Sequence, residues 1–124
     1  MSELLKRQML FTRLLPSLLD WCNAQPQQSA VVKEVYRPPE MVELYVQRGI
    51  GSRTSVHALS LAADIMLFRF DEQAQACTYL KDAADYADAG HFWKTLHPLC
   101  RWGGDFSNRK DGDHFSIESP EGHQ

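Results

Sequence analysis

The sequence predicts a small α+β domain in which helices flank a short antiparallel sheet. Apolar residues follow helical spacing near the amino terminus and in residues 39–47, whereas residues 30–36, 61–68 and part of 111–117 favour strands. The two kinds of element are mixed without the strand–helix–strand order of a parallel sheet. With 124 residues, 44% hydrophobic and 23% charged, the chain has the size and composition of a single domain, residues 1–124.

Residues 1–22 predict the first helix. Leu4, Phe11 and Leu18 lie near one face of it, and Pro16 is expected to interrupt or kink it. Arg13 breaks the apolar run and no small-residue cleavage site follows, so the segment is not typical of a signal peptide. No apolar run reaches the roughly 18 residues of a membrane span. We therefore expect synthesis in the cytoplasm and no stable membrane insertion.

Proline and glycine delimit the next elements. The strand at residues 30–36 is stopped by Arg37 and the two prolines that follow it. Pro39 then opens a helix that runs to about Gln47, and Gly49 is its expected carboxyl-terminal stop. A loop follows this glycine.

The second half of the chain adds two helices and a last strand. Alanine-rich residues 71–90 predict a helix, and residues 91–99 predict a shorter one. An Asp-Gly turn signal precedes the strand within residues 111–117. Residues 119–124 are expected to be frayed, which leaves about residues 30–118 as the core of the domain.

Charge and cysteine content exclude some classes of protein. The net charge is −3, and there is no basic stripe of the kind a nucleic-acid-binding protein presents. The three cysteines, Cys22, Cys77 and Cys100, are odd in number and form no Cys-x-x-Cys pair. We therefore expect neither a disulfide framework nor a cysteine-rich zinc site, and each cysteine is interpreted as a small core residue.

The segment SVHALSLAADIMLF, residues 55–68, carries a histidine and a carboxylate within an apolar run. A carboxylate buried in a strand must be paired, hydrogen-bonded or bound to a metal, and Asp64 occupies such a position. Seven residues of straight strand span roughly 23 Å, so His57 reaches Asp64 only if the chain turns near residues 58–60. On its own, such a pair is more often a structural hydrogen bond.

The stretch DGDHF, residues 111–115, supplies a second polar cluster. His114 leaves one face of the predicted strand, and together with His57 and Asp64 it gives two imidazoles and one carboxylate. This set matches the three protein ligands of a catalytic zinc site. Asp111 would be placed to take a proton from a metal-activated water, or is a plain turn residue. Asp113 is expected to be a solvated surface charge.

A third stretch is Trp102-Gly103-Gly104-Asp105. Paired glycines let a backbone pass close to another group or adopt a positive φ. Asp105 either orients a ligand histidine through its second nitrogen or caps the following turn.

Together, the three stretches resemble the zinc peptidases of the bacterial cell wall. This family includes D-alanyl-D-alanine carboxypeptidases, vancomycin-resistance D,D-peptidases and the L-alanyl-D-glutamate peptidases that serve as phage endolysins. Its pattern is S-x-H-x6-D, then W-G-G-D, then D/E-x-x-H-F/W, and the resemblance covers about residues 30–118. The pattern is met in order by Ser55, His57 and Asp64, by residues 102–105, and by Asp111, His114 and Phe115.

The resemblance assigns roles to these residues. It implies one Zn²⁺ per chain on His57, Asp64 and His114, with Asp111 as the general base that later protonates the leaving amine. Arg37 would be a cation that holds a substrate carboxylate or the developing oxyanion, a role that suits a guanidinium. Ser55 would hydrogen-bond near the site, with Trp102 and Asp105 around it. Ser60 stands where the family usually has glycine, and is strained if that position has a positive φ.

Within the family, Asp111 in place of glutamate, the small size and the missing export signal favour the endolysin branch. That branch implies hydrolysis of the L-Ala–D-Glu bond of peptidoglycan stem peptides. The protein, expected to be a monomer, would act in the periplasm after the membrane is permeabilised. The first alternative is a D-Ala–D-Ala carboxypeptidase, which needs a cation for the terminal carboxylate. The second is a non-catalytic zinc-binding or wall-binding domain.

Overall fold

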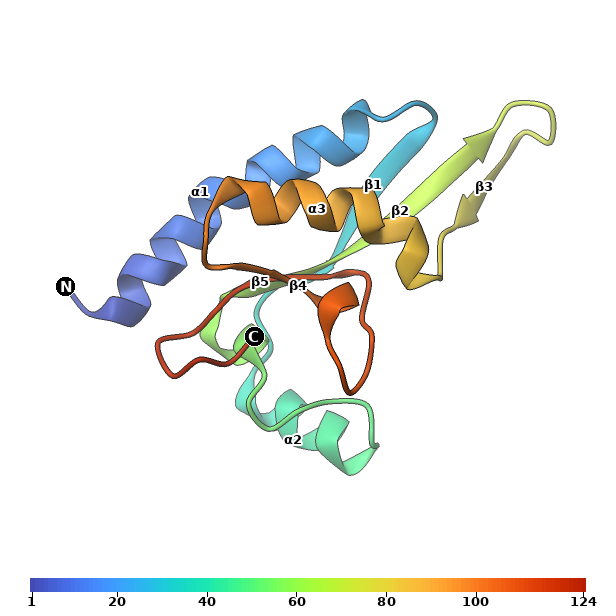
Figure 1. Ribbon diagram of the computed structural model, residues 1–124. Coiled ribbons are helices and arrows are strands. Elements are labelled where there is room, and N and C mark those ends of the chain that lie inside the picture. Colours follow the sequence, from blue (N-terminus) through green and yellow to red (C-terminus); the bar gives the residue numbers. More distant parts are fainter.

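The computed structural model describes residues 1–124 and has a single antiparallel sheet of five strands (Figure 1). The strand order is β1-β2-β5-β4, and β3 pairs with the far end of β2. The small α+β domain predicted from the sequence is thereby confirmed. The helices are α1 (Glu3–Ala24), α2 (Pro39–Gln47) and α3 (Ala87–Leu96), and short 3₁₀ turns span Val56–Leu59, Ala83–Tyr86 and Gly103–Asp105. The strands are β1 (Gln28–Glu34), β2 (Ala62–Asp71), β3 (Ala76–Tyr79), β4 (Cys100–Trp102) and β5 (His114–Ile117).

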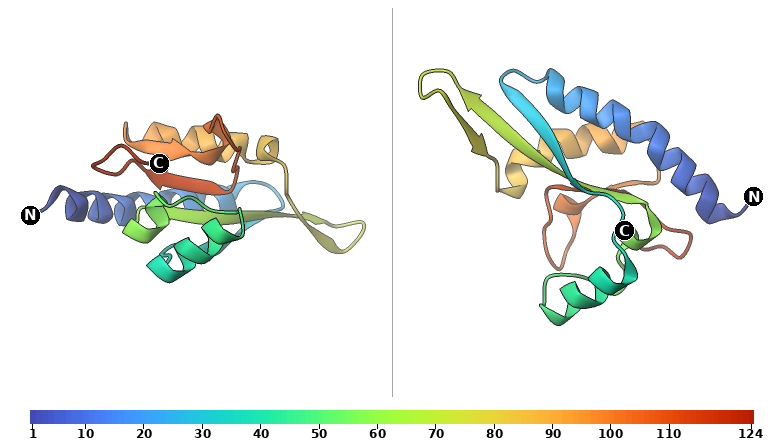
Figure 2. Two further views of the ribbon diagram at one scale, coloured as in Figure 1. Left: turned by 90° about the horizontal axis from the view of Figure 1, so that it is seen from below. Right: turned by 180° about the vertical axis from the view of Figure 1, so that it is seen from behind.

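Helices α1 and α3 pack against each other and against the sheet, and the hydrophobic core lies between them and the strands. The ring of Trp93 is its centre, with ring centroids 5.9 Å from Phe11 and 6.5 Å from Phe115. Its indole N–H donates to the carbonyl oxygens of Arg101 and Ser116, so this large ring buries no unpaired polar group. The short helix α2 lies apart from these two helices, at the opposite end of the molecule (Figures 1 and 2).

The side chains of strand β2 alternate between the hydrophobic core and the opposite face of the sheet, where the candidate site lies. Ala63, Ile65 and Leu67 are buried in the core, whereas Asp64 and Met66 point to the other face and are half-buried. His114 of β5 is the register partner of Asp64. The pairing therefore puts a ligand-type imidazole and a carboxylate side by side on the face opposite the core.

The prediction of a helix within residues 71–90 is wrong for most of that range. Asp71 accepts hydrogen bonds from the main-chain N–H groups of Gln73 and Ala74, and Gln75 adopts a φ of +51°. These features make a hairpin turn from β2 into β3, because an aspartate that bonds the backbone two and three residues on favours a turn over a helix. Helix α3 begins only at Ala87 and replaces both the end of that prediction and the shorter helix predicted at 91–99.

Helix α1 runs uninterrupted through Pro16, so the interruption that the proline could have caused is absent. Residues 119–124, for which fraying is expected, form a turn in which Ser119 is buried and Gly122 has a φ of +87°. The main-chain N–H of Gly122 donates to the carbonyl oxygen of Ser119 at 2.9 Å.

None of the helices combines the length and the apolar character needed to cross a membrane.

Candidate metal centre

His57 lies in a tight 3₁₀ turn that reverses the chain between β1 and β2. Ser55 caps this turn, since its hydroxyl accepts from the main-chain N–H of His57 at 3.3 Å. Ser60 ends it in the left-handed region, with a φ of +55°. The reversal expected near residues 58–60 is therefore present, and it brings the Nε2 atom of His57 to 3.2 Å from Asp64 Oδ1.

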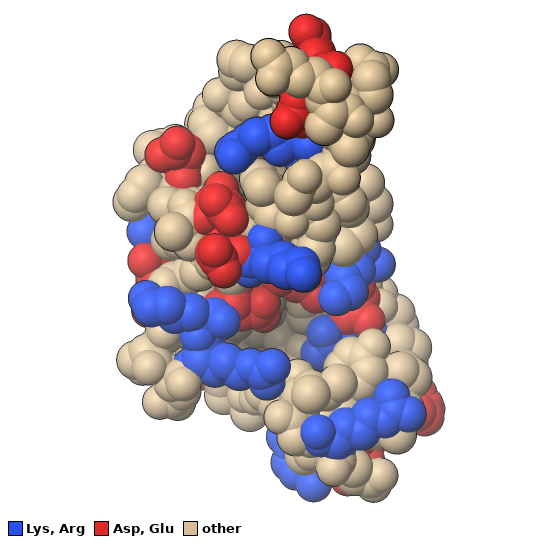
Figure 3. Space-filling model, turned by 90° about the vertical axis from the view of Figure 1, so that its right-hand side faces the viewer, with Lys and Arg blue, Asp and Glu red and all other residues tan.

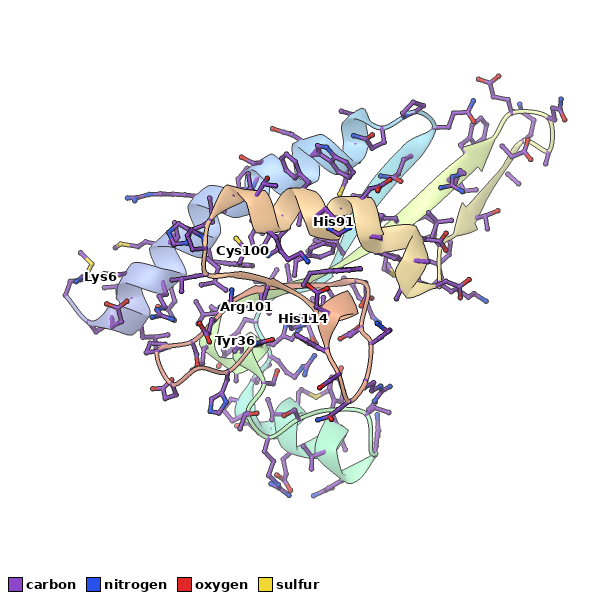
Figure 4. The ribbon with its side chains drawn as sticks, viewed as in Figure 1. Lys6, Tyr36, His91, Cys100, Arg101 and His114 are labelled. Atoms are coloured by element: carbon purple, nitrogen blue, oxygen red, sulfur yellow. The ribbon has the colours of Figure 1, made fainter.

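His114 completes the group from the neighbouring strand. Its Nδ1 atom lies 3.7 Å from the same oxygen of Asp64, and the ligand atoms of the three residues all lie within 4.8 Å of one another. Both histidines are nearly fully buried, with 2% and 6% of their surface exposed. Figure 4 labels His114, at the β5 end that faces the turn formed by residues 103–105.

The outer nitrogen of each imidazole is held by a main-chain oxygen. Nδ1 of His57 lies 2.9 Å from the carbonyl oxygen of Val35, and Nε2 of His114 lies 2.8 Å from the main-chain oxygen of Gln124. A carbonyl only accepts, so these outer nitrogens carry the hydrogens. In the neutral rings, the inner nitrogens therefore present lone pairs to Asp64, the arrangement that metal-binding histidines use.

Asp64 Oδ1 is a buried polar atom without a hydrogen-bond partner, because its close contact with His57 lacks hydrogen-bond geometry. Burial opposes ionisation of Asp64, but His114 and His57, as hydrogen-bond donors and positive charges when protonated, outweigh burial and hold its pKa below the usual range. When both rings are neutral, two nitrogen lone pairs and a carboxylate oxygen instead converge on one point with no proton between them. This donor set fits Zn²⁺, which takes imidazole nitrogen and carboxylate oxygen and leaves a fourth position open in catalytic sites.

Asp111 and Asp113 place further carboxylates beside Asp64, with one oxygen of each of the three within 4.8 Å of the others. Asp111 is exposed, as suits a group that exchanges protons with solvent and substrate. Asp113 is half-buried, so the solvated surface charge expected for it is wrong. Burial and then the adjacent Asp111 raise the pKa of Asp113 to about 7, and Asp64 adds to the effect.

The two glycines of the 102–105 stretch are required by close packing. A Cβ on Gly103 would lie 2.0 Å from the carbonyl oxygen of Asp111, and one on Gly104 would lie 2.1 Å from the ring of Trp102. Trp102 is buried, and its indole N–H donates to the carbonyl oxygen of Gly112 at 2.7 Å. The tryptophan and the glycines therefore hold the loop that carries Asp111 against the sheet.

Asp105 does not orient a ligand histidine. Its carboxylate pairs with Lys94 Nζ of α3 at 2.6 Å, and the histidines use main-chain oxygens instead. The resemblance placed Asp105 around the site, but the structure gives it the role of a surface ion pair.

Arg37 lies at the site, but its guanidinium already donates hydrogen bonds to neighbouring side chains. Its guanidinium donates to Glu34 at 2.8 and 2.5 Å and to the hydroxyl of Ser55 at 3.2 Å. It also lies 4.0 Å from Asp64 Oδ2 and over the ring of Tyr45. Arg37 is buried, so its charge is fixed in position beside the three candidate ligands, and Ser55 contacts both this arginine and the His57 turn.

Sequence reasoning missed several residues that shape the site. Glu34 follows a bulge in β1 that makes it the register partner of Asp64. A charged residue at the end of a strand signals a site only weakly, and main-chain oxygens give no sequence signal at all. The missed groups are Glu34, the main-chain oxygens of Val35 and Gln124, Tyr45 beneath Arg37, and Phe106, whose ring lies 5.3 Å from that of His114.

The face of the molecule shown in Figure 3 carries both positive and negative side chains. Figure 3 shows a hollow above the lower lobe, with acidic side chains along its upper wall and lysine or arginine side chains around it. Exposed cations that stand close to site residues in the sequence include Lys33 just before Glu34, Arg53 before Ser55, and Arg109 and Lys110 just before Asp111.

The fold and these residues define a class of protein: a small α+β domain with a candidate single-metal centre and an adjacent carboxylate. The family model described as D-alanyl-D-alanine carboxypeptidase matches residues 48–117, a range that contains His57, Asp64, Asp111 and His114. Because this range is more than half of the chain, the protein belongs to this family, the M15 zinc peptidases, and is a hydrolase. No curated protein matches the chain.

A solved structure supports the fold assignment. The crystal structure of the Serratia marcescens L-Ala D-Glu endopeptidase ChiX is similar to this chain with a TM-score of 0.67. The match covers 86% of this chain and 77% of that one, with 20% sequence identity. At this identity, the likeness shows that the two proteins share a fold.

Proposed function

We propose that this protein is a zinc peptidase that hydrolyses the L-Ala–D-Glu bond of peptidoglycan stem peptides. The observation that carries the proposal is the unpartnered, buried oxygen of Asp64, which faces two imidazole lone pairs beside Asp111. Membership of the peptidase family supports the hydrolytic chemistry. The shared fold with an L-Ala D-Glu endopeptidase supports the choice of bond.

His57, Asp64 and His114 would hold one Zn²⁺. When bound, zinc polarises a scissile carbonyl and lowers the pKa of a water at its open position. Asp111 takes the proton of the attacking water and delivers it to the leaving amine, as its exposure beside the ligand group allows. Arg37, fixed by Glu34 and Ser55, balances the negative charge that develops on the substrate oxygen.

The D-Ala–D-Ala carboxypeptidase is the second candidate, because the matching family model carries that description. A carboxypeptidase needs a cation for the free terminal carboxylate of its substrate. Arg37 already donates to Glu34 and to Ser55, so its guanidinium is less available for that task.

The experiment is mass spectrometry of purified disaccharide-pentapeptide after incubation with the zinc-loaded protein, alongside the Asp111→Ala variant. A released peptide that begins at D-Glu supports the proposal. Loss of a single terminal D-Ala would identify a carboxypeptidase. If the protein holds zinc and gives no product, the non-catalytic domain is the better description.

A lytic role in the endolysin manner belongs to the same proposal. The protein would be made in the cytoplasm and would reach the wall in the periplasm once the membrane is permeabilised. Expression in a bacterium should then cause lysis only when chloroform is added. Lysis without chloroform, or none with it, would contradict this role.

A further inference from the structure

The chain returns to the candidate metal centre after β5, through a segment that we name the return loop, residues 118–124. Main-chain hydrogen bonds within it join Ser119 to His123 at 2.8 Å and Gly122 to Ser119 at 2.9 Å. The Ser119 hydroxyl also accepts from the main-chain N–H of His123 at 3.0 Å. These bonds give the loop a defined shape, and its last residue lies beside the sheet (Figure 1).

The return loop ends on a candidate ligand. The main-chain oxygen of Gln124 accepts from Nε2 of His114 at 2.8 Å and from the hydroxyl of Ser116 at 2.7 Å. Both donors belong to β5 and are buried, with His114 6% and Ser116 0% exposed. A buried N–H of this kind would lose its only hydrogen-bond partner if the loop moved away.

Helix α1 anchors the return loop from the other end of the chain. Arg7 donates through one nitrogen to the carbonyl oxygens of Glu118 at 2.5 Å and Ser119 at 2.9 Å. The Glu118 side chain pairs in turn with Arg101 at 3.1 Å. Arg7 and the return loop both lie outside residues 48–117, the range that the family model matches.

We propose that the return loop is a positioning element for the metal ligand His114, acting through the main-chain oxygen of Gln124. By accepting from Nε2, this oxygen fixes the tautomer of the ring and turns the lone pair of Nδ1 toward Asp64. Loss of such a partner typically weakens metal binding by about 10- to 100-fold. The inference rests on the proposed function only in that the positioned ring is a ligand.

The test compares the full chain with a variant that lacks residues 122–124. Zinc affinity is measured by chelator competition, and the geometry of the site by the visible absorption of bound Co²⁺. We expect the deletion to weaken zinc binding at least about tenfold and to change the Co²⁺ spectrum. His123→Ala is the matched control, because it keeps the main chain of the loop and should leave both readouts unchanged. Equal affinity and equal spectra for the deletion would overturn the proposal, and so would an equal loss in His123→Ala.

A second readout needs neither metal nor activity. At a pH at which the ring is neutral, the ¹⁵N shifts of the metal-free full chain should show His114 as the Nε2–H tautomer, and an Nδ1–H tautomer would overturn the proposal. If the deletion does not fold, Arg7→Ala replaces it, and mixed tautomers are expected there, whereas a pure Nε2–H tautomer would contradict the role of the loop. If the full chain binds no zinc while His114 holds the Nε2–H tautomer, the proposed function fails and the positioning contact stands.

Discussion

The two histidines of the centre meet the same oxygen of Asp64 from different kinds of scaffold. His57 lies in a tight turn that Ser55 caps and Ser60 ends, and its outer nitrogen is held by Val35, 22 residues earlier in the chain. His114 lies on a strand, and its outer nitrogen is held by Gln124, 10 residues later. The comparison teaches that a short motif can specify the local backbone around a candidate ligand, whereas the main-chain oxygen that orients each ring comes from outside the motif.

The largest expected effect concerns the carboxylate on the His114 side. Asp111→Asn keeps the shape of the loop but removes the proton acceptor, so hydrolysis should fall by about 10²- to 10⁴-fold. Zinc affinity should stay within a factor of a few, because Asp111 is not one of the three ligands. Kinetics on a muropeptide, together with chelator competition, would check both. A parallel loss of zinc would mean that Asp111 is itself a ligand.

Metal removal should affect both histidines together. Zinc at 100 times its dissociation constant would stabilise the native state by about 2.7 kcal/mol, and EDTA should remove this gain. Asp64→Asn should abolish the response of the melting temperature to zinc, since it takes away the shared carboxylate charge. Thermal melts with and without zinc give the answer. An equal zinc-induced shift in Asp64→Asn would show that the ion binds elsewhere.

Gly103 supports His114 and the loop that carries Asp111. Gly103→Ala places a methyl group 2.0 Å from the carbonyl oxygen of Asp111, so the loop must shift. We expect a loss of about 1–3 kcal/mol in the free energy of unfolding, measured by urea titration. Asn108→Ala, exposed on the same loop, should change stability by less than about 0.5 kcal/mol. Equal effects of the two changes would contradict the packing role of Gly103.

The smallest expected effect lies on the His57 side. Ser60 has a φ of +55°, so Ser60→Gly should relieve backbone strain and stabilise the fold by up to about 1 kcal/mol. Gln75→Gly, at a φ of +51° in the distant β2–β3 turn, is the matched control and should stabilise similarly. Urea titrations of both variants would show this. Destabilisation by Ser60→Gly alone would mean that the serine side chain itself supports the turn.

Sequence patterns located the parts of the site that depend on local spacing. The turn after His57, the pairing of His114 with Asp64 and the close approach at Gly103 all follow from the order of residues along the chain. Alanine content alone predicted a helix in residues 71–90, and that prediction was wrong because the turn made by Asp71 overrode helix propensity. Local propensity is a weak guide wherever a side chain offers the backbone another hydrogen bond.

The contacts that sequence could not reveal are those between distant segments and main-chain atoms. Gln124 acts through an oxygen that every residue possesses, and Arg7 reaches the return loop across 111 positions of sequence. Glu34 meets Arg37 and faces Asp64 only because a bulge changes the register of β1. Asp105, by contrast, had a residue type suited to orienting a histidine, yet it pairs with Lys94. Residue type predicts which chemistry is available, and topology decides which group performs it.

The most direct test of the central claim is the location of bound zinc by anomalous diffraction from a crystal of the zinc-loaded protein. We predict one zinc per chain, bonded to His57 Nε2, an Asp64 oxygen and His114 Nδ1 at about 2.0–2.2 Å. A zinc ion held by Asp111 and Asp113 without the histidines, or no ion at these residues, would contradict the account.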